Sequence, residues 1–232
     1  GFRKKDQVKF REKWQEAVRK KDSILCVGLD PAEYGQRPEN FIPKGADKLQ
    51  WCLDYIRNVA PYCSAVKPNR NFIEDFSRDD KRKIARLIHE LEMVSIKDAK
   101  LADIGKTNDS GFYHAQEEGY DAVTYAPFPG NIKEAVDQAH ARNLGLIPLV
   151  LMSNPEYKFE KNAKQFGFDK YEYLALKAAE CEADAVVIGA PSPTNHISEK
   201  EIKRVKEIMG NPLVLMPGIG AQGGEAGIIL KE

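Results

Sequence analysis

The feature that most constrains this chain is a regular alternation of short apolar segments with longer amphipathic ones. The apolar segments are bounded by Gly, Pro, Asn or Asp, and most are too short for helices, so they are predicted to be buried strands. Their nearly continuous apolar character is typical of a parallel sheet that is covered on both faces. The expected strands are Ser23–Leu29, Ser64–Lys67, Met93–Leu101, Ala122–Tyr125, Gly145–Met152, Ala185–Gly189 and Pro212–Met216.

Amphipathic segments between these runs are predicted to be helices, and a charged, periodic helix over about residues 4–21 precedes the first strand. The last predicted helix starts at Ser198 and has Glu201 three residues later, which is a capping-box pattern. No linker or low-complexity tract divides the chain, so a single domain over residues 1–232 is expected. The helices expected after the first strand are Ala46–Ala60, Arg78–Leu91, Ser110–Glu118, Ile132–Arg142, Asp169–Glu182 and Ser198–Met209.

The order of these elements suits two fold classes, a (β/α)8 TIM barrel and a doubly wound open sheet. Spacing alone does not separate the two. A barrel needs an eighth strand, whereas residues 227–232 resemble the start of a helix. We therefore expect an α/β barrel in which the eighth strand is absent from the given sequence, either because the barrel is open or because the C-terminus is incomplete.

Charge and cysteine usage exclude several classes of partner. The 35 basic and 35 acidic residues balance, so neither nucleic acid nor an anionic membrane is an expected partner. The four cysteines have no CxxC pair and no metal-ligand spacing, which is typical of reduced thiols in a cytoplasmic protein. No His, Asp or Glu cluster has the spacing of metal ligands, so no metal is expected.

Charged residues occur where several predicted strands end, and in parallel α/β folds the chemistry gathers at those ends. Asp30 follows the first strand, Lys67 ends the second, and Asp98 and Lys100 lie on the third. Asp98 and Lys100 are two apart on a strand, so both side chains are expected to point to one face. One such residue could belong to an ordinary ion pair at the rim, but four together indicate a functional site.

A glycine-rich segment, Pro217–Gly224, follows the seventh predicted strand. Backbone N–H groups in such a turn can cradle a phosphate, and barrels often bind phosphate after strands seven and eight. Taken alone the pattern is weak, since a tight turn would produce it as well. It does not fit a dinucleotide-binding fingerprint, which belongs after the first strand.

Five ordered motifs together resemble orotidine 5′-monophosphate decarboxylases. Asp98-Ala-Lys-Leu-Ala-Asp-Ile-Gly-Lys-Thr107 resembles the family's D-x-K-x-x-D-I-x-x-T signature, and Pro217-Gly-Ile-Gly-Ala-Gln-Gly-Gly224 resembles its P-G-[IV]-x-x-Q-G-G loop. The resemblance extends from about Ser23 to Gly224. The remaining motifs are Gly28-Leu-Asp-Pro31, Val66-Lys-Pro-Asn69 and Met152-Ser-Asn-Pro155.

This resemblance implies a dimeric barrel enzyme, without metal or cofactor, that converts orotidine 5′-phosphate to UMP and CO2 in the last step of de novo UMP synthesis. It implies that Lys67, Asp98 and Lys100 form a charged array that Asp103 completes from the other subunit. Lys100 would stabilise and protonate the carbanion at C6 of the pyrimidine.

The resemblance also assigns substrate contacts. It implies that Asp30 binds ribose hydroxyls and that Ser153 binds the pyrimidine amide. Ile104 and Thr107 would reach across the dimer. Phosphate would be held by the loop that contains Pro217, Gln222 and Gly223.

Two departures and two alternatives accompany this interpretation. The family's phosphate-binding arginine on strand eight has no counterpart before Glu232, and Glu225 replaces the usual Asp after Gly-Gly. One alternative is a Mg²⁺-dependent sugar-phosphate decarboxylase of the same superfamily, such as a 3-keto-L-gulonate 6-phosphate decarboxylase, although Ile104, Thr107 and Gln222 argue against it. The other is a truncated barrel that binds nucleotides without turnover.

Overall fold

The computed structural model describes residues 9–219, which form a seven-stranded parallel sheet with the order β1-β2-β3-β4-β5-β8-β9. Each strand in this order follows its neighbour along the chain by a helical crossover, as expected for βαβ units. All seven predicted strands are present. They are β1 (Cys26–Leu29), β2 (Ala65–Pro68), β3 (Val94–Leu101), β4 (Ala122–Tyr125), β5 (Gly145–Leu151), β8 (Val186–Ile188) and β9 (Val214–Leu215).

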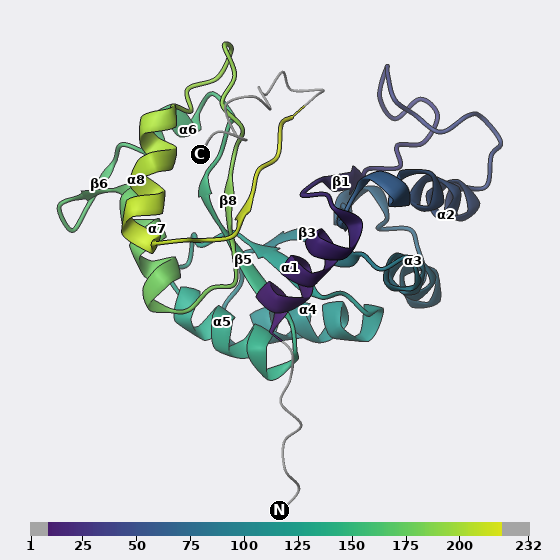
Figure 1. The fold of residues 1–232 in the computed structure, drawn as a ribbon, viewed down its shortest axis with the longest axis horizontal. Helices are drawn as coiled ribbons and strands as arrows, with labels where there is room; N and C mark the ends of the chain where they lie inside the picture. Colours follow the sequence, from purple (N-terminus) through teal and green to yellow (C-terminus); the bar gives the residue numbers. More distant parts are fainter. Residues whose placement is uncertain (1–8, 220–232) are drawn as a thin grey trace, which may run out of the picture.

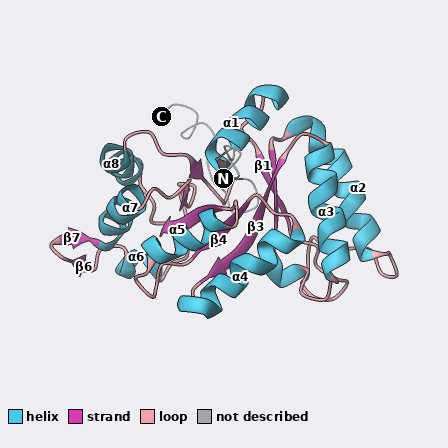
Figure 2. Cartoon of the chain, turned by 90° about the horizontal axis from the view of Figure 1, so that it is seen from below, coloured by secondary structure: helices cyan, strands magenta, loops and turns pink. Residues whose placement is uncertain are grey.

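Helices surround the outside of this curved sheet (Figures 1 and 2). Their apolar stripes pack against the outward side chains of the strands in two large clusters of buried residues. The six main crossover helices are α2 (Lys48–Val59), α3 (Arg78–Glu90), α4 (Gly105–Glu118), α5 (Ile132–Ala141), α7 (Lys170–Glu180) and α8 (Glu199–Met209).

Several boundaries and elements differ from the sequence-based expectation. Helix α4 begins at Gly105, five residues before the predicted start, and the first helix, α1 (Phe10–Lys21), begins after Lys9, whose backbone is extended. The part of the predicted 4–21 helix within residues 1–8 lies outside the described residues. The connection from β5 to α7 also contains elements that no pattern predicted, the helix α6 (Tyr157–Glu160) and a hairpin of β6 (Lys164–Gln165) and β7 (Phe168–Asp169). Two single-turn 3-10 helices, η1 (Ala60–Tyr62) and η2 (Arg70–Phe72), flank β2.

Helix α1 covers the N-terminal ends of the strands. Its buried residues Phe10, Trp14 and Ala17 belong to the same apolar cluster as the inward side chains of the sheet. Phe10 packs directly on the first residue of β5, Gly145, where an added Cβ would lie 2.6 Å from the phenyl ring. Polar contacts tie α1 to the turns beneath the strands, including a 2.6 Å hydrogen bond from Arg11 Nη2 to the carbonyl oxygen of Asn211.

Inward side chains change in character along the strands. Near the N-terminal ends they are apolar and pack with α1, as do Ala65, Val94 and Ala122. Two residues further along each of these strands, the inward positions are Lys67, Ile96 and Thr124, and Asp98 follows Ile96 on β3. The apolar inner cluster therefore supports a polar layer at the carboxyl ends of the strands.

Two further observations concern residues 9–219. No helix there combines the length and the apolar character that a membrane crossing requires. All four cysteines are free thiols, and Cys52 and Cys63 are buried.

Within residues 9–219, β1 and β9 are the two edges of the sheet, so the barrel wall described here has seven strands.

Candidate active site

Three charged side chains meet at the carboxyl ends of β2 and β3. The carboxylate of Asp98 lies between two ammonium groups, with Oδ2 2.7 Å from Lys67 Nζ and Oδ1 2.7 Å from Lys100 Nζ. Because β2 and β3 are parallel neighbours, their ends bring Lys67 and Asp98 together, as the sequence predicted. The predicted charged array is thus present for three of its four members within one chain.

Burial makes this cluster electrostatically strong. The side chain of Asp98 is 7% exposed and that of Lys67 15%, whereas Lys100 is 46% exposed. Burial opposes ionisation of Asp98, but the charge of Lys67 and hydrogen bonds from both lysines outweigh it and lower the Asp98 pKa. Burial also opposes the charge on Lys67, yet attraction to Asp98 raises the Lys67 pKa above its usual value. Both groups are therefore ionised at neutral pH.

The backbone conformation that brings Lys100 to Asp98 differs from the regular strand that we expected. The β3–β4 register shifts between Lys97 and Leu101, and Lys100 has a φ of 44°, in the left-handed region. Simple two-residue alternation along a regular strand is therefore wrong here, although its outcome, a shared face for Asp98 and Lys100, is confirmed. We call this irregular segment, residues 97–101, the β3 bulge, because local breaks of this kind in strand pairing commonly re-aim a side chain beside an active site.

The hydroxyl of Thr124 holds this bulge in place. Thr124 Oγ1 accepts hydrogen bonds from the backbone N–H groups of Ala99, at 3.1 Å, and Lys100, at 3.0 Å. The same hydroxyl donates to Asp98 Oδ1, at 3.1 Å. Thr124 was not among the predicted site residues. The only sequence signal for it is one small polar side chain within the short, otherwise apolar strand Ala122–Tyr125.

Asp30 directly follows β1, beside the charged cluster. Its Oδ1 is buried and has no hydrogen-bond partner within the described residues, while its backbone carbonyl accepts from Ala32 N–H and Arg37 Nη2. Buried carboxylate oxygens are normally paired, so this free acceptor is suited to a donor from a bound molecule.

Ser153 and Pro217 lie after the ends of β5 and β9. Ser153 packs against Gly189, where an added Cβ would lie 2.9 Å from Ser153 Cβ and 3.1 Å from its backbone nitrogen. The Pro217 carbonyl accepts a 2.8 Å hydrogen bond from Ala190 N–H. Both segments are thus anchored to the end of β8. Gln222 and Gly223, also predicted to contact substrate, lie outside the described residues.

The remaining predicted residues, Asp103, Ile104 and Thr107, are exposed at the start of α4. Asp103 Oδ1 accepts a 2.8 Å hydrogen bond from Ile104 N–H. In the part of the chain that the structure describes, Asp103 forms no ion pair with Lys67 or Lys100. The chain alone therefore does not bring Asp103 into the array.

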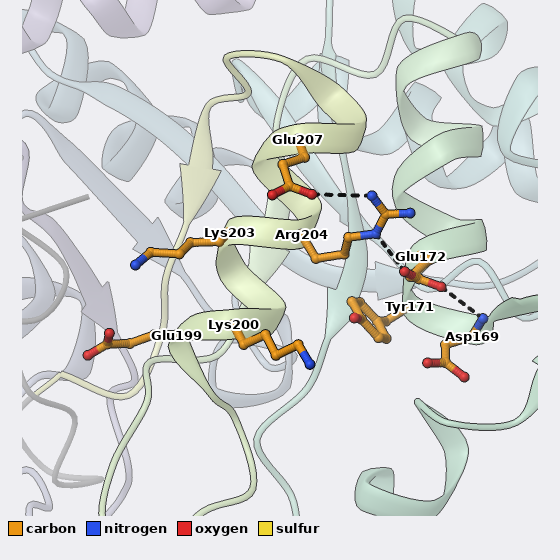
Figure 3. A pocket seen from close by; sticks show the side chains of 8 residues that line it. All are labelled: Asp169, Tyr171, Glu172, Glu199, Lys200, Lys203, Arg204 and Glu207. Carbon is orange, nitrogen blue, oxygen red and sulfur yellow. Dashed lines mark hydrogen bonds and ion pairs between the residues drawn. The ribbon is translucent and has the colours of Figure 1, made fainter.

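Two surface pockets lie away from this cluster. One lies between α7 and α8, where Arg204 is paired with Glu172 at 2.7 Å and Glu207 at 3.2 Å (Figure 3). The other lies beneath the sheet, between the start of α1 and the end of α5. Neither pocket contains a residue of the Lys67–Asp98–Lys100 cluster, so the strand ends remain the candidate site.

A barrel-type parallel sheet with a partly buried Lys–Asp–Lys cluster at its strand ends is the arrangement of an α/β-barrel enzyme. The chain belongs to the orotidine 5′-phosphate decarboxylase / HUMPS family, whose family model matches residues 23–230.

Individual relatives agree with this assignment. The chain is 31% identical over 229 residues to the orotidine 5′-phosphate decarboxylase of Ralstonia pickettii, a match that covers 94% of this chain and 80% of that protein. Its fold is similar to that of a putative orotidine-monophosphate-decarboxylase from Toxoplasma gondii, with a TM-score of 0.80, 24% identity, and coverage of 96% and 83% of the two chains. It is also similar to Leishmania donovani UMP synthase, with a TM-score of 0.79, 23% identity, and coverage of 97% of this chain and 48% of that one. These structures support the barrel over the doubly wound alternative.

Proposed function

We propose that this protein decarboxylates orotidine 5′-phosphate to UMP and CO2, the last step of de novo pyrimidine nucleotide synthesis. The observation that supports this most directly is the buried Asp98 carboxylate held 2.7 Å from both Lys67 and Lys100. The family membership and the named activity of the Ralstonia relative give independent support.

The chemistry requires a cation where negative charge develops. When the bond between C6 and the carboxylate breaks, its electron pair remains on C6 and CO2 departs. The Lys100 ammonium stabilises this carbanion electrostatically and then transfers a proton to C6, which forms UMP. The Lys100 side chain is about half exposed, so it can regain a proton from solvent after product leaves.

Asp98 and Lys67 prepare Lys100 for this role. The Asp98 carboxylate accepts a hydrogen bond from the Lys100 ammonium group and fixes its direction. Lys67, which pairs with the other carboxylate oxygen, keeps Asp98 ionised. Asp98 lies where the substrate carboxylate is lost, and preorganised charges in such a site require no rearrangement during the reaction.

Other strand ends supply the substrate contacts. The unpaired Asp30 Oδ1 accepts a hydrogen bond from a ribose hydroxyl. Ser153 binds the pyrimidine amide, and Pro217 with Gln222 and Gly223 surrounds the phosphate. Binding energy from the phosphate, remote from C6, is available to stabilise the transition state.

We further propose a cytoplasmic homodimer with shared active sites. Asp103, Ile104 and Thr107 are exposed in the isolated chain, which suits side chains that complete the site of a second copy. In a twofold dimer this exchange is reciprocal, so each site receives one Asp103.

The first test measures UMP formation from orotidine 5′-phosphate by the purified protein, with and without EDTA. We expect equal rates in both conditions. Absence of UMP formation together with an EDTA-sensitive decarboxylation of 3-keto-L-gulonate 6-phosphate would favour the Mg²⁺-dependent sugar-phosphate decarboxylase. Tight UMP binding without turnover would favour a non-catalytic barrel.

The second test concerns the shared site. Asp103→Asn and Lys100→Ala, each nearly inactive alone, are mixed in equal amounts and allowed to exchange subunits. About half the dimers become hybrids with one intact site of two, so about a quarter of wild-type activity should return. If exchange is verified and no activity returns, Asp103 acts within its own subunit.

A further inference from the structure

The segment that carries Asp103 is fastened to a neighbouring helix, α5. This segment leaves the end of β3 and enters α4 at Gly105, whose N–H donates a 2.7 Å hydrogen bond to Glu134 Oε1 on α5. Gly105 has a φ of 53°, a left-handed conformation that glycine adopts without strain. The turn after Asp103 is therefore defined by one glycine and by one carboxylate from another helix.

Helix α4 needs this external contact because its own sequence provides no N-terminal cap. The residue at the N-cap position is Ile104, which has no side-chain acceptor, and no side-chain cap is present. The first N–H groups of a helix lack internal partners and are normally satisfied by a capping side chain. Glu134 performs this function from α5, so the position of α4 depends on it.

A second contact fixes the backbone of Asp103 itself. Asn131, at the start of α5, donates a 3.1 Å hydrogen bond from Nδ2 to the Asp103 carbonyl. Its Oδ1 accepts a hydrogen bond from the hydroxyl of Tyr125, the buried last residue of β4. Burial and the charges of Glu134 and Asp103 raise the Tyr125 pKa to about 12, so the phenol remains a donor at neutral pH.

Gln138 closes the arrangement. Its Nε2 donates a 3.0 Å hydrogen bond to the Gly105 carbonyl, and its Oε1 accepts a 3.1 Å hydrogen bond from Asn108 Nδ2 in the first turn of α4. Both peptide groups of Gly105 are thus bonded to α5, by way of Glu134 and Gln138.

We infer that Asn131, Glu134 and Gln138, which we call the α5 clamp, are positioning residues that set the direction in which Asp103 leaves its own barrel toward the partner's site. This inference rests on the proposed function. The clamp residues themselves do not contact substrate. Since Asp103 serves the partner, damage to the clamp impairs the other subunit's site and leaves the site on its own barrel intact.

Glu134 allows the sharpest single substitutions. Glu134→Ala removes the acceptor for Gly105 N–H, and we expect kcat/KM to fall about tenfold, which corresponds to about 1.4 kcal/mol of transition-state stabilisation. Glu134→Gln retains a carbonyl acceptor and should restore most of the activity. Asp137→Ala is the matched control, because Asp137 lies on the same helix and pairs only with exposed Lys133 in the structure described.

Hybrid dimers separate positioning from a general structural defect. In an equal mixture of Glu134→Ala with Lys100→Ala, each hybrid has one site that combines an intact Lys100 with an undamaged Asp103 segment, so about a quarter of wild-type activity should return. In an equal mixture of Glu134→Ala with Asp103→Asn, neither site of a hybrid combines an intact Lys100 with an undamaged Asp103 segment. Only about a twentieth of wild-type activity should then remain.

The outcomes decide between the proposals. If Glu134→Ala instead recovers with Asp103→Asn and not with Lys100→Ala, its defect lies in its own barrel, and the clamp proposal is overturned while the shared site stands. If the reference pair Asp103→Asn and Lys100→Ala also fails to recover, the shared site and the clamp proposal are overturned together.

Discussion

Replacement of Thr124 by valine tests whether the β3 bulge positions Lys100. Thr124 is 2% exposed, and its hydroxyl serves three partners at once: the N–H groups of Ala99 and Lys100 and the carboxylate of Asp98. Valine has nearly the same shape but no polar atom. The substitution therefore leaves two backbone donors of the bulge without an acceptor while it fills the same space.

The expected magnitude follows from those two donors. A buried donor left unsatisfied costs about 1–3 kcal/mol, and the Lys100 N–H lies nearer solvent, so we expect a total loss of about 2–4 kcal/mol in the free energy of unfolding. Because the left-handed conformation at Lys100 loses its support, kcat should fall at least tenfold, about 1.4 kcal/mol. Thr124→Ser, which retains the hydroxyl, should lose about 1 kcal/mol of stability for the missing methyl group and keep most activity.

Urea unfolding at pH 7 measures the stability difference, and initial rates of UMP formation at saturating substrate measure kcat. If the valine variant is no less stable than the serine variant and retains its kcat, the Thr124 hydroxyl does not hold the bulge.

Two other charge pairs give predictions about stability. Lys97 and Glu118 form a 2.5 Å ion pair behind β3. Lys97→Met should lower the free energy of unfolding by about 3–5 kcal/mol, because the buried Glu118 carboxylate loses its nearest cation. In urea unfolding, the double variant Lys97→Met/Glu118→Leu should recover most of that loss. The hydrogen bond from His140 to Asp184 raises the His140 pKa, although burial opposes this shift. The pair therefore stabilises the fold fully below about pH 6.5, the ordinary pKa of histidine, and this stabilisation is lost as the pH rises through the raised pKa of the folded state. Urea midpoints measured from about pH 6 to 8.5 should therefore fall more in the wild type than in His140→Gln, and parallel curves would refute the pairing.

Much of the fold can be predicted from the sequence because its strands are short, apolar and separated by clear turn residues. Every predicted strand is present, with boundaries within three residues of the expected ones. The helix α6 and the hairpin Lys164–Asp169 were not predicted, because neither is long enough to produce a periodic hydrophobic pattern.

The charged cluster could be predicted because adjacent parallel strands end at one edge, which brings Lys67 and Asp98 together. The irregular backbone that brings Lys100 to them could not be predicted, because it depends on the partner strand and on the hydroxyl of Thr124. The contacts of Asn131 and Glu134 with the Asp103 segment could not be predicted from the sequence either. In the sequence Asn131 is a polar residue directly before an amphipathic helix and Glu134 is an ordinary polar position within it. Only the tertiary packing of α4 against α5 brings both residues to the Asp103 segment.

The assignment of Lys100 as the group that stabilises and protonates the carbanion is the central claim. The Lys100 side chain is about half exposed, and Lys67 remains bonded to Asp98 when Lys100 is removed. Lys100→Ala should therefore unfold at nearly the same urea concentration as the wild type. Its binding of UMP should remain measurable, because the ribose, pyrimidine and phosphate contacts are made by other residues.

The measurement that tests this claim most directly is kcat for UMP formation by Lys100→Ala, with UMP affinity determined on the same sample. We predict that decarboxylation falls below about a thousandth of the wild-type rate, a loss of more than about 4 kcal/mol in transition-state stabilisation, while UMP still binds. A variant that binds UMP and retains more than about a tenth of wild-type kcat would have lost less than about 1.4 kcal/mol, and Lys100 could not then be the residue that stabilises and protonates C6.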